Sequence, residues 1–261
     1  MEQRSSLNKQ FIQSCDYDFL RNDARLGDNI ALLAISGSHA YGTNIESSDV
    51  DIRGCALNSR SDLLGLSNFE HFVDKSTDTV IYSFKKFVQL LINANPNVIE
   101  LLGCRPEHYL VVNRAGQELL DNRKLFLSQR VVDTFGGYAA SQLQKLRQGL
   151  KGLHCAKDAM RVNKHAMHLI RLYLMCIDIL EKEEIITYRS KERELLLSIR
   201  NGAFVTGDGR YKPAFFEMVD HYRMRMDYAR VTTSLQVSPD IKKIKELVTS
   251  VNEMVVLGHK T

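Results

Sequence analysis

The residues whose types and spacing most clearly indicate a chemical function lie in the segment ISGSHAYGTNIESSDVDIRG, residues 35–54. Asp49 and Asp51 are separated by one residue, so in an extended segment both carboxylates project from the same face. Adjacent carboxylates repel unless a cation or a proton lies between them. Arg53, on that same face, is predicted either to contact substrate or to pair with Asp51. Carboxylate oxygens suit Mg²⁺ or Mn²⁺, which waters and substrate phosphates usually complete, so the pair predicts a metal site.

A second chemical feature, Gly37-Ser38, precedes the two aspartates by about ten residues. The apolar run Ile30–Ile35 ends directly before it, so a buried strand is expected to pass into a Gly-Ser turn and a helix start. Unpaired N–H groups at such a start bind phosphate, and Ser38 adds a hydroxyl donor. Because glycine lets a phosphate approach the backbone, the turn is predicted to be a phosphate cradle. Beside a metal site, such a cradle indicates nucleotide chemistry.

A third carboxylate would complete a two-metal site, and Glu70, Asp74 and Asp78 are the candidates. Asp78 begins the segment DTVIYSF, whose β-branched and aromatic residues predict a strand. That strand can lie beside the one that carries the aspartate pair. We therefore favour Asp78 as the ligand of a second metal and as the general base that activates an acceptor hydroxyl.

A cationic strip is predicted on a helix in the second half of the chain. Lys164, His168 and Arg171 fall at helical spacing and share one face. They belong to a basic stretch, residues 123–171, with a net charge of +8, whereas residues 1–122 carry a net charge of −5. We interpret the strip as a contact for phosphate; a solvated face or pairing with acids is the alternative.

The hydrophobic patterns predict three strands and, after them, helices. The strands are expected over 30–35, 50–56 and 77–84. A helix follows from Phe84, and Asn95-Pro96 starts another, with asparagine as its cap and Glu100 in a structural role near its first turn. Further helical periodicity covers 112–121, 128–150, 157–182, 190–200, 212–233 and 239–256. The predicted fold is α+β: a small mixed sheet with flanking helices over residues 1–125, then an all-helical part over 126–261.

The cysteine pattern and the hydropathy indicate the compartment in which the protein is expected. Five cysteines are scattered singly with no CxxC pair, which argues against a disulfide scaffold and predicts reduced thiols in the cytoplasm. No apolar run approaches the roughly 18 residues that a membrane span requires. The first residues also lack the apolar core of a signal peptide, so no membrane association is expected.

Taken together, these motifs resemble the nucleotidyltransferase fold of the DNA polymerase β superfamily. More narrowly, they are similar to the nucleotidyltransferases that are associated with RNA ligases in RNA repair, which occur in bacteria and phages. The resemblance covers most of residues 31–175, and residues 180–261 resemble no family that we can name. The segments that carry it are GSHAYGT, SDVDIRG, DTVIY, KKFVQLLINANPNVIELL and KHAMHLIRLY.

The resemblance implies a catalytic core over residues 1–125 and a helical domain over 126–261 that closes the nucleotide cleft. It also implies transfer of a nucleoside monophosphate from an NTP, such as ATP, to a hydroxyl acceptor, with release of pyrophosphate. An RNA or tRNA end is the expected acceptor. Two alternatives stay open: a nucleotide- or RNA-binding regulator without turnover, and an enzyme that modifies a protein side chain.

The same resemblance assigns roles to the motif residues. Gly37 and Ser38 would hold the triphosphate. Asp49 and Asp51 would bind Mg²⁺, and Asp78 would be the third carboxylate. The pattern that contains Lys164, His168 and Arg171 is part of the resemblance, and we expect these three residues to bind nucleotide.

Overall fold

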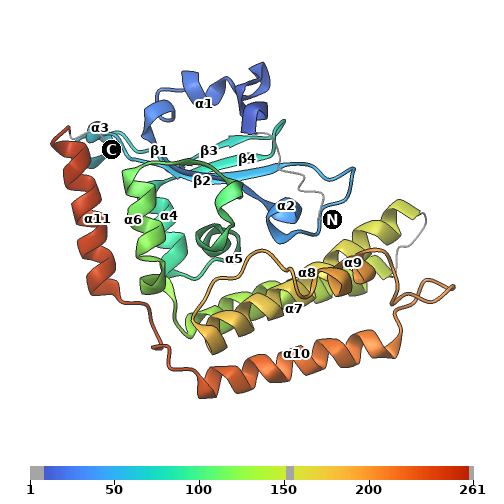
Figure 1. The fold of residues 1–261 in the computed structure, drawn as a ribbon. Coiled ribbons are helices and arrows are strands. Elements are labelled where there is room, and N and C mark those ends of the chain that lie inside the picture. Colours follow the sequence, from blue (N-terminus) through green and yellow to red (C-terminus); the bar gives the residue numbers. More distant parts are fainter. Residues whose placement is uncertain (1–8, 151–155, 259–261) are drawn as a thin grey trace. The chain divides into compact units, whose positions relative to one another are not determined.

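A computed structural model describes residues 9–150 and 156–258, which divide into two compact units (Figure 1). The first unit contains the residues up to Ile92, Cys104–Leu125 and those from Asp240 onward, and the second contains Asn93–Gly103 and Phe126–Pro239. The observed division therefore shares the expected boundary after residue 125 but differs from the expectation in two places. Residues 93–103 belong to the helical unit, and the last helix belongs to the sheet unit.

The first unit is built on a five-stranded mixed sheet with the order β3-β4-β2-β1-β5. Its strands are β1 Ile30–Ser36, β2 Asp51–Ala56, β3 His71–Asp74, β4 Thr79–Ser83 and β5 Tyr109–Val112. β2 pairs in parallel with β4, while β1 runs antiparallel to both β2 and β5, and β3 runs antiparallel to β4. All three predicted strands are confirmed. The two edge strands were not predicted.

Burial explains why these strands form the core of the first unit. Every residue of β1 is buried, as its continuous apolar sequence requires of a central strand. The core includes Leu33 from β1, Ile52 from β2 and Ile81 from β4. The helices of this unit are α1 Phe19–Asn22, α2 Gly37–Tyr41, α3 Arg60–Leu64, α4 Phe84–Ile92, α6 Arg114–Asp121 and α11 Ile241–Val256.

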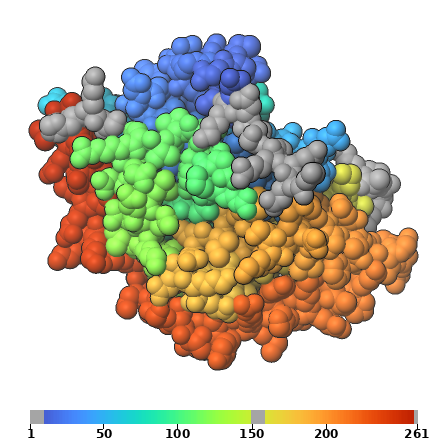
Figure 2. Space-filling model, in the orientation of Figure 1, coloured from blue at the N-terminus to red at the C-terminus, as the bar shows by residue number. Residues whose placement is uncertain are grey.

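The second unit is helical and centres on α8, Ala156–Lys182, which packs against α7, α9 and α10. The other helices of this unit are α5 Pro96–Ile99, α7 Arg130–Leu150, α9 Arg193–Arg200 and α10 Pro213–Thr232. Asn95 caps α5 by accepting from Asn97 N, and Pro96 is its first residue, which confirms the expected helix start. α10 lies at the surface (orange in Figure 2), with Met224 and Tyr228 exposed.

The described residues include no helix that is both long and apolar enough to cross a membrane. Cys15, Cys55, Cys104 and Cys176 form no disulfide bond among the residues that the structure describes. Cys155 lies outside the residues that the structure describes.

Candidate active site

The Gly-Ser turn lies directly against the aspartate strand. β1 ends at Ser36 and α2 begins at Gly37, so the predicted passage from strand to helix is confirmed. The β1–β2 register pairs Ser36 with Asp51. A Cβ atom built on Gly37 would lie 1.8 Å from Asp51 Oδ2, and the Gly37 φ angle is +63°. Glycine is therefore required here for two reasons, the left-handed backbone and the carboxylate in contact with it.

Replacing Gly37 with alanine is expected to lower the free energy of unfolding by about 1–3 kcal/mol. The new methyl group would strain the backbone and force the Asp51 carboxylate out of its position, so any activity that depends on Asp51 should fall as well. Urea denaturation measures the change in stability. Gly137→Ala is the control, because a Cβ at this exposed α7 position meets no atom of the described part of the chain within 4 Å. It should raise stability by about 0.5–1 kcal/mol. Equal effects at both glycines would contradict the argument.

Ser38 is the second residue of α2 and is half-buried. Its backbone carbonyl accepts a hydrogen bond from Thr43 N at 2.9 Å, and this bond connects α2 with the loop that follows it. In that loop Ser48 Oγ accepts from Ile45 N at 2.9 Å. The loop then leads to Asp49. The backbone from Ser38 to Asp49 is thus held by its own hydrogen bonds.

The two aspartates differ in their surroundings. Asp51 is the first residue of β2 and is partly buried, whereas Asp49 is exposed in the irregular segment before the strand. Because β2 begins one residue later than the strand predicted over 50–56, strand alternation does not by itself orient Asp49.

The structure separates the three candidates for the third carboxylate. Ile52 N donates to Asp78 O at 3.2 Å, and the parallel register of β2 and β4 pairs Ile52 with Thr79. Asp78 therefore lies beside the end of β2 that carries Asp51. Glu70 lies at the other end of β4, where its carbonyl accepts from Ser83 N.

Asp74 is the last residue of β3, directly before the turn that leads into β4, and it lies near the same sheet end as Asp78. Its Oδ1 accepts from Ser76 Oγ at 2.5 Å and from Thr77 N at 2.9 Å. The hydrogen bond from Ser76, followed by the one from Thr77 N, lowers the pKa of the Asp74 carboxyl. Asp74 is thus engaged in stabilising its own turn.

Arg53 connects Asp78 with Asp51. Its Nη2 atom lies 2.7 Å from Asp78 Oδ1 and 3.7 Å from Asp51 Oδ1. Its Nη1 atom donates to Ile52 O at 2.9 Å and also to Asp78 O. The pairing with Asp51, one of the two predicted roles, is present at the longer distance. The pairing with Asp78 was missed, because it joins residues 25 positions apart and depends on strand order.

The donor chemistry of the site suits a magnesium ion that substrate completes. No three His, Cys, Asp or Glu side chains within residues 10–148 and 159–258 form a group that could hold a metal by themselves. Mg²⁺ often takes only one or two protein carboxylates and completes its shell with waters and phosphates. Asp49 and Asp51 match that smaller requirement, whereas the Asp78 carboxylate is engaged by Arg53.

The three residues of the predicted cationic strip have different environments in the second unit. Lys164 is exposed, His168 is half-buried and Arg171 is buried. Arg171 Nη1 donates to Glu100 Oε2 at 3.0 Å, and both side chains are only 4% exposed. Burial, and then the charges of Arg171 and Lys164, lower the pKa of His168 well below its usual value. The three residues thus differ in exposure and in electrostatic surroundings, and nucleotide binding by them stays a prediction.

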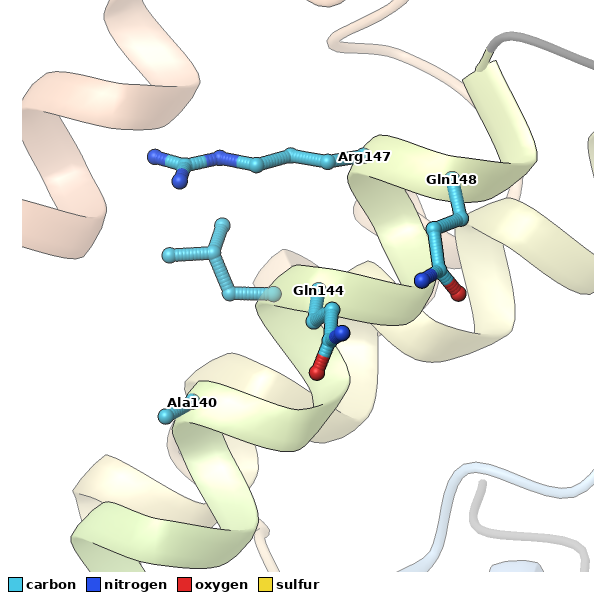
Figure 3. Close-up of a pocket in the computed structure, with 5 residues that line it drawn as sticks. Ala140, Gln144, Arg147 and Gln148 are labelled. Atoms are coloured by element: carbon cyan, nitrogen blue, oxygen red, sulfur yellow. The ribbon is translucent and has the colours of Figure 1, made fainter.

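A shallow pocket of about 270 Å³ lies on α7 in the second unit, and Arg147 extends from the helix at its edge (Figure 3). Its other lining residues are Ala140, Leu143, Gln144 and Gln148. Their spacing places them on one helix face. None of the predicted site residues lines this pocket.

Comparison with known proteins gives three matches. Residues 13–203 match the model of RlaP, the RNA repair pathway DNA polymerase beta family. A curated protein of Enterobacteria phage T4, the "Uncharacterized 38.9 kDa protein in nrdC-mobD intergenic region", is 29% identical over 144 residues, which are 48% of this chain and 41% of that protein. The match thus spans less than half of the phage protein. The crystal structure of a nucleotidyltransferase-like protein from Exiguobacterium sibiricum 255-15 aligns with 95% of this chain and 78% of its own, at 11% identity and a TM-score of 0.29.

Proposed function

Because the chain belongs to the RNA repair pathway DNA polymerase beta family, we propose that it transfers a nucleoside monophosphate from an NTP to an acceptor hydroxyl. The bond between the α-phosphorus and the pyrophosphate oxygen breaks while a bond to the acceptor oxygen forms. Pyrophosphate leaves, and the acceptor gives up its proton. The observation that carries this proposal is the contact of Gly37 with the Asp51 carboxylate, because the turn that would bind phosphate then lies beside a carboxylate that would bind metal.

In this proposal the turn binds the triphosphate of the nucleotide. The first N–H groups of α2 have no acceptor within the helix and are suited to phosphate oxygens. Ser38 Oγ adds a hydroxyl donor, and the absence of a side chain at Gly37 lets the Asp51 carboxylate lie directly against the turn.

Asp49 and Asp51 would hold Mg²⁺ or Mn²⁺. When bound, such an ion stabilises the negative charge that develops on the phosphoryl oxygens. A carboxylate oxygen of Asp78 accepts the proton of the acceptor hydroxyl. The Asp78 side chain is 54% exposed, so an acceptor that approaches from solvent can reach it.

An RNA or tRNA end is the acceptor that we propose. The family is described as part of an RNA repair pathway, and the net charge of +8 over residues 123–171 supports a polyanionic partner. RNA ends also provide the hydroxyl groups that the reaction requires.

Label transfer tests the proposal. The protein is incubated with each α-³²P-labelled NTP and Mg²⁺ or Mn²⁺, together with RNA ends, tRNA or protein acceptors. Label that moves to RNA or tRNA supports the proposed reaction and identifies the base. Label that moves to protein would show that the acceptor is a protein side chain and not RNA. Tight NTP binding without transfer to any acceptor would favour a nucleotide-binding regulator instead.

Replacing Ser38 with alanine is expected to weaken NTP binding by about 1–2 kcal/mol, or roughly 5- to 30-fold in Kd. The change removes one hydrogen bond to a charged ligand but keeps the backbone donors of the turn. Isothermal titration calorimetry measures the affinity. Ser47→Ala, at an exposed position in the loop that follows, is the control and should bind like the unmodified protein. Unchanged affinity in the Ser38 variant would show that the turn does not face the triphosphate.

A further inference from the structure

Arg53 occupies the position between two carboxylates of the candidate site. Its Nη2 atom is 2.7 Å from Asp78 Oδ1 and 3.7 Å from Asp51 Oδ1. Two anionic groups at the ends of neighbouring parallel strands would otherwise repel each other. The arginine therefore supplies, within the protein chain, the positive charge that a metal ion would supply at the same carboxylates.

The contacts of Arg53 divide into a firm part and a weak part. Nη1 is anchored to the backbone, because it donates to Ile52 O and to Asp78 O. Among the residues that the structure describes, Nη2 contacts only carboxylates, and the three side chains are 21% (Arg53), 26% (Asp51) and 54% (Asp78) exposed. Ion pairs in contact with water contribute little free energy, so the contacts of Nη2 are exchangeable while the backbone anchor persists.

We infer that Arg53 is the resident counter-cation of Asp51 and Asp78 and that it competes with divalent metal in the nucleotide-free protein. This inference rests on the metal site of the proposed function. A second cation that approaches Asp51 is repelled by the guanidinium and must displace Nη2. The negative charge of a triphosphate offsets that repulsion and offers Nη2 phosphate oxygens as new partners. Metal thus enters the site together with the nucleotide, and Arg53 sets this order of binding.

The test measures Mn²⁺ binding by electron paramagnetic resonance without nucleotide. Arg53→Gln should bind Mn²⁺ about 5- to 10-fold more tightly than the unmodified protein, a factor within the usual range of coupling between two ligands. Arg53→Lys keeps the positive charge and should bind Mn²⁺ as weakly as the unmodified protein. Arg60→Gln removes the same charge beyond the opposite end of β2 and should leave the affinity unchanged. Thermal unfolding establishes that each variant is folded.

The outcomes separate this inference from the function on which it rests. If Mn²⁺ binds through Asp51, as shown by its loss in Asp51→Asn, but Arg53→Gln binds no more tightly, then Arg53 is only a structural bridge. That result overturns the inference and leaves the proposed metal site standing. If no variant binds Mn²⁺, even with NTP present, the metal site itself fails, and the inference fails with it. If Arg53→Gln is unfolded, the test uses Arg53→Lys. Stronger Mn²⁺ binding by Arg53→Lys than by the unmodified protein would then contradict charge competition.

Discussion

Asp51→Asn is expected to reduce nucleotidyl transfer by about 10³-fold or more while the protein stays folded. Loss of a metal ligand removes several kcal/mol of charge stabilisation in the transition state, and each 1.36 kcal/mol corresponds to a factor of about ten in rate. Asparagine has nearly the shape of aspartate, so it keeps the close packing against Gly37. The label-transfer rate gives the activity, and thermal unfolding should show a midpoint within a few degrees of the unmodified protein.

The geometry of the sheet provides matched controls for this variant. Glu70→Gln changes a carboxylate at the far end of β4 and should keep full activity. Asp78→Asn should lose activity, whereas Asp74→Asn should lose stability in its turn but keep transfer. Retained transfer in the double variant Asp49→Asn/Asp51→Asn would end the metal hypothesis.

Arg171→Met is expected to destabilise the protein by about 3–5 kcal/mol, because it leaves the Glu100 carboxylate buried without its partner. The pair is 96% removed from solvent on both sides, at an N–O distance of 3.0 Å. Thr187 Oγ1 also donates to Glu100 O at 2.6 Å, which holds the same segment. Urea denaturation followed by circular dichroism measures the loss.

A surface ion pair in the same unit is the control for the buried one. Arg225 donates to Glu181 at 2.9 and 2.6 Å, but these side chains are 43% and 30% exposed. Arg225→Met should therefore cost about 1 kcal/mol or less. The double variant Glu100→Leu/Arg171→Met should regain most of the lost stability, because neither charge of this buried pair is left. If Arg171→Met lowers the free energy of unfolding no more than Arg225→Met does, then burial does not make the Glu100–Arg171 ion pair more important for stability than the surface pair.

The elements that the sequence predicts well are those whose signal is local. The apolar run that forms β1 and the Asn95-Pro96 helix start each specify their structure within a few residues. β3 and β5 have only four residues each, and none of these is fully buried, so their side-chain pattern carries little information. Edge strands depend on pairing with neighbours that lie far along the chain, which local patterns do not reveal.

The same distinction applies to the candidate site. The Gly-Ser turn and the aspartate pair have adjacent, local signals, and the structure places Gly37 against Asp51. Asp78, the nearer partner of Arg53, lies 25 residues away and the partner of Arg171 lies 71 residues away, so no local pattern reveals these two pairs. Lys164 and Arg171 both lie on α8, but α8 packs against several helices, and helical spacing does not tell which part of a helix face is buried.

The path of the chain through the two units has a consequence for synthesis on the ribosome. The chain leaves the first unit after Ile92, returns at Cys104, leaves again after Leu125 and returns at Asp240. Asp240 N donates to Leu125 O at 3.2 Å, and α11 packs against α3. The first unit therefore receives its final helix only after every residue of the second unit has been made. In a nascent chain that stops before residue 240, the sheet unit is incomplete and less stable, because α11 is missing. Every predicted catalytic aspartate has nevertheless been synthesised by then.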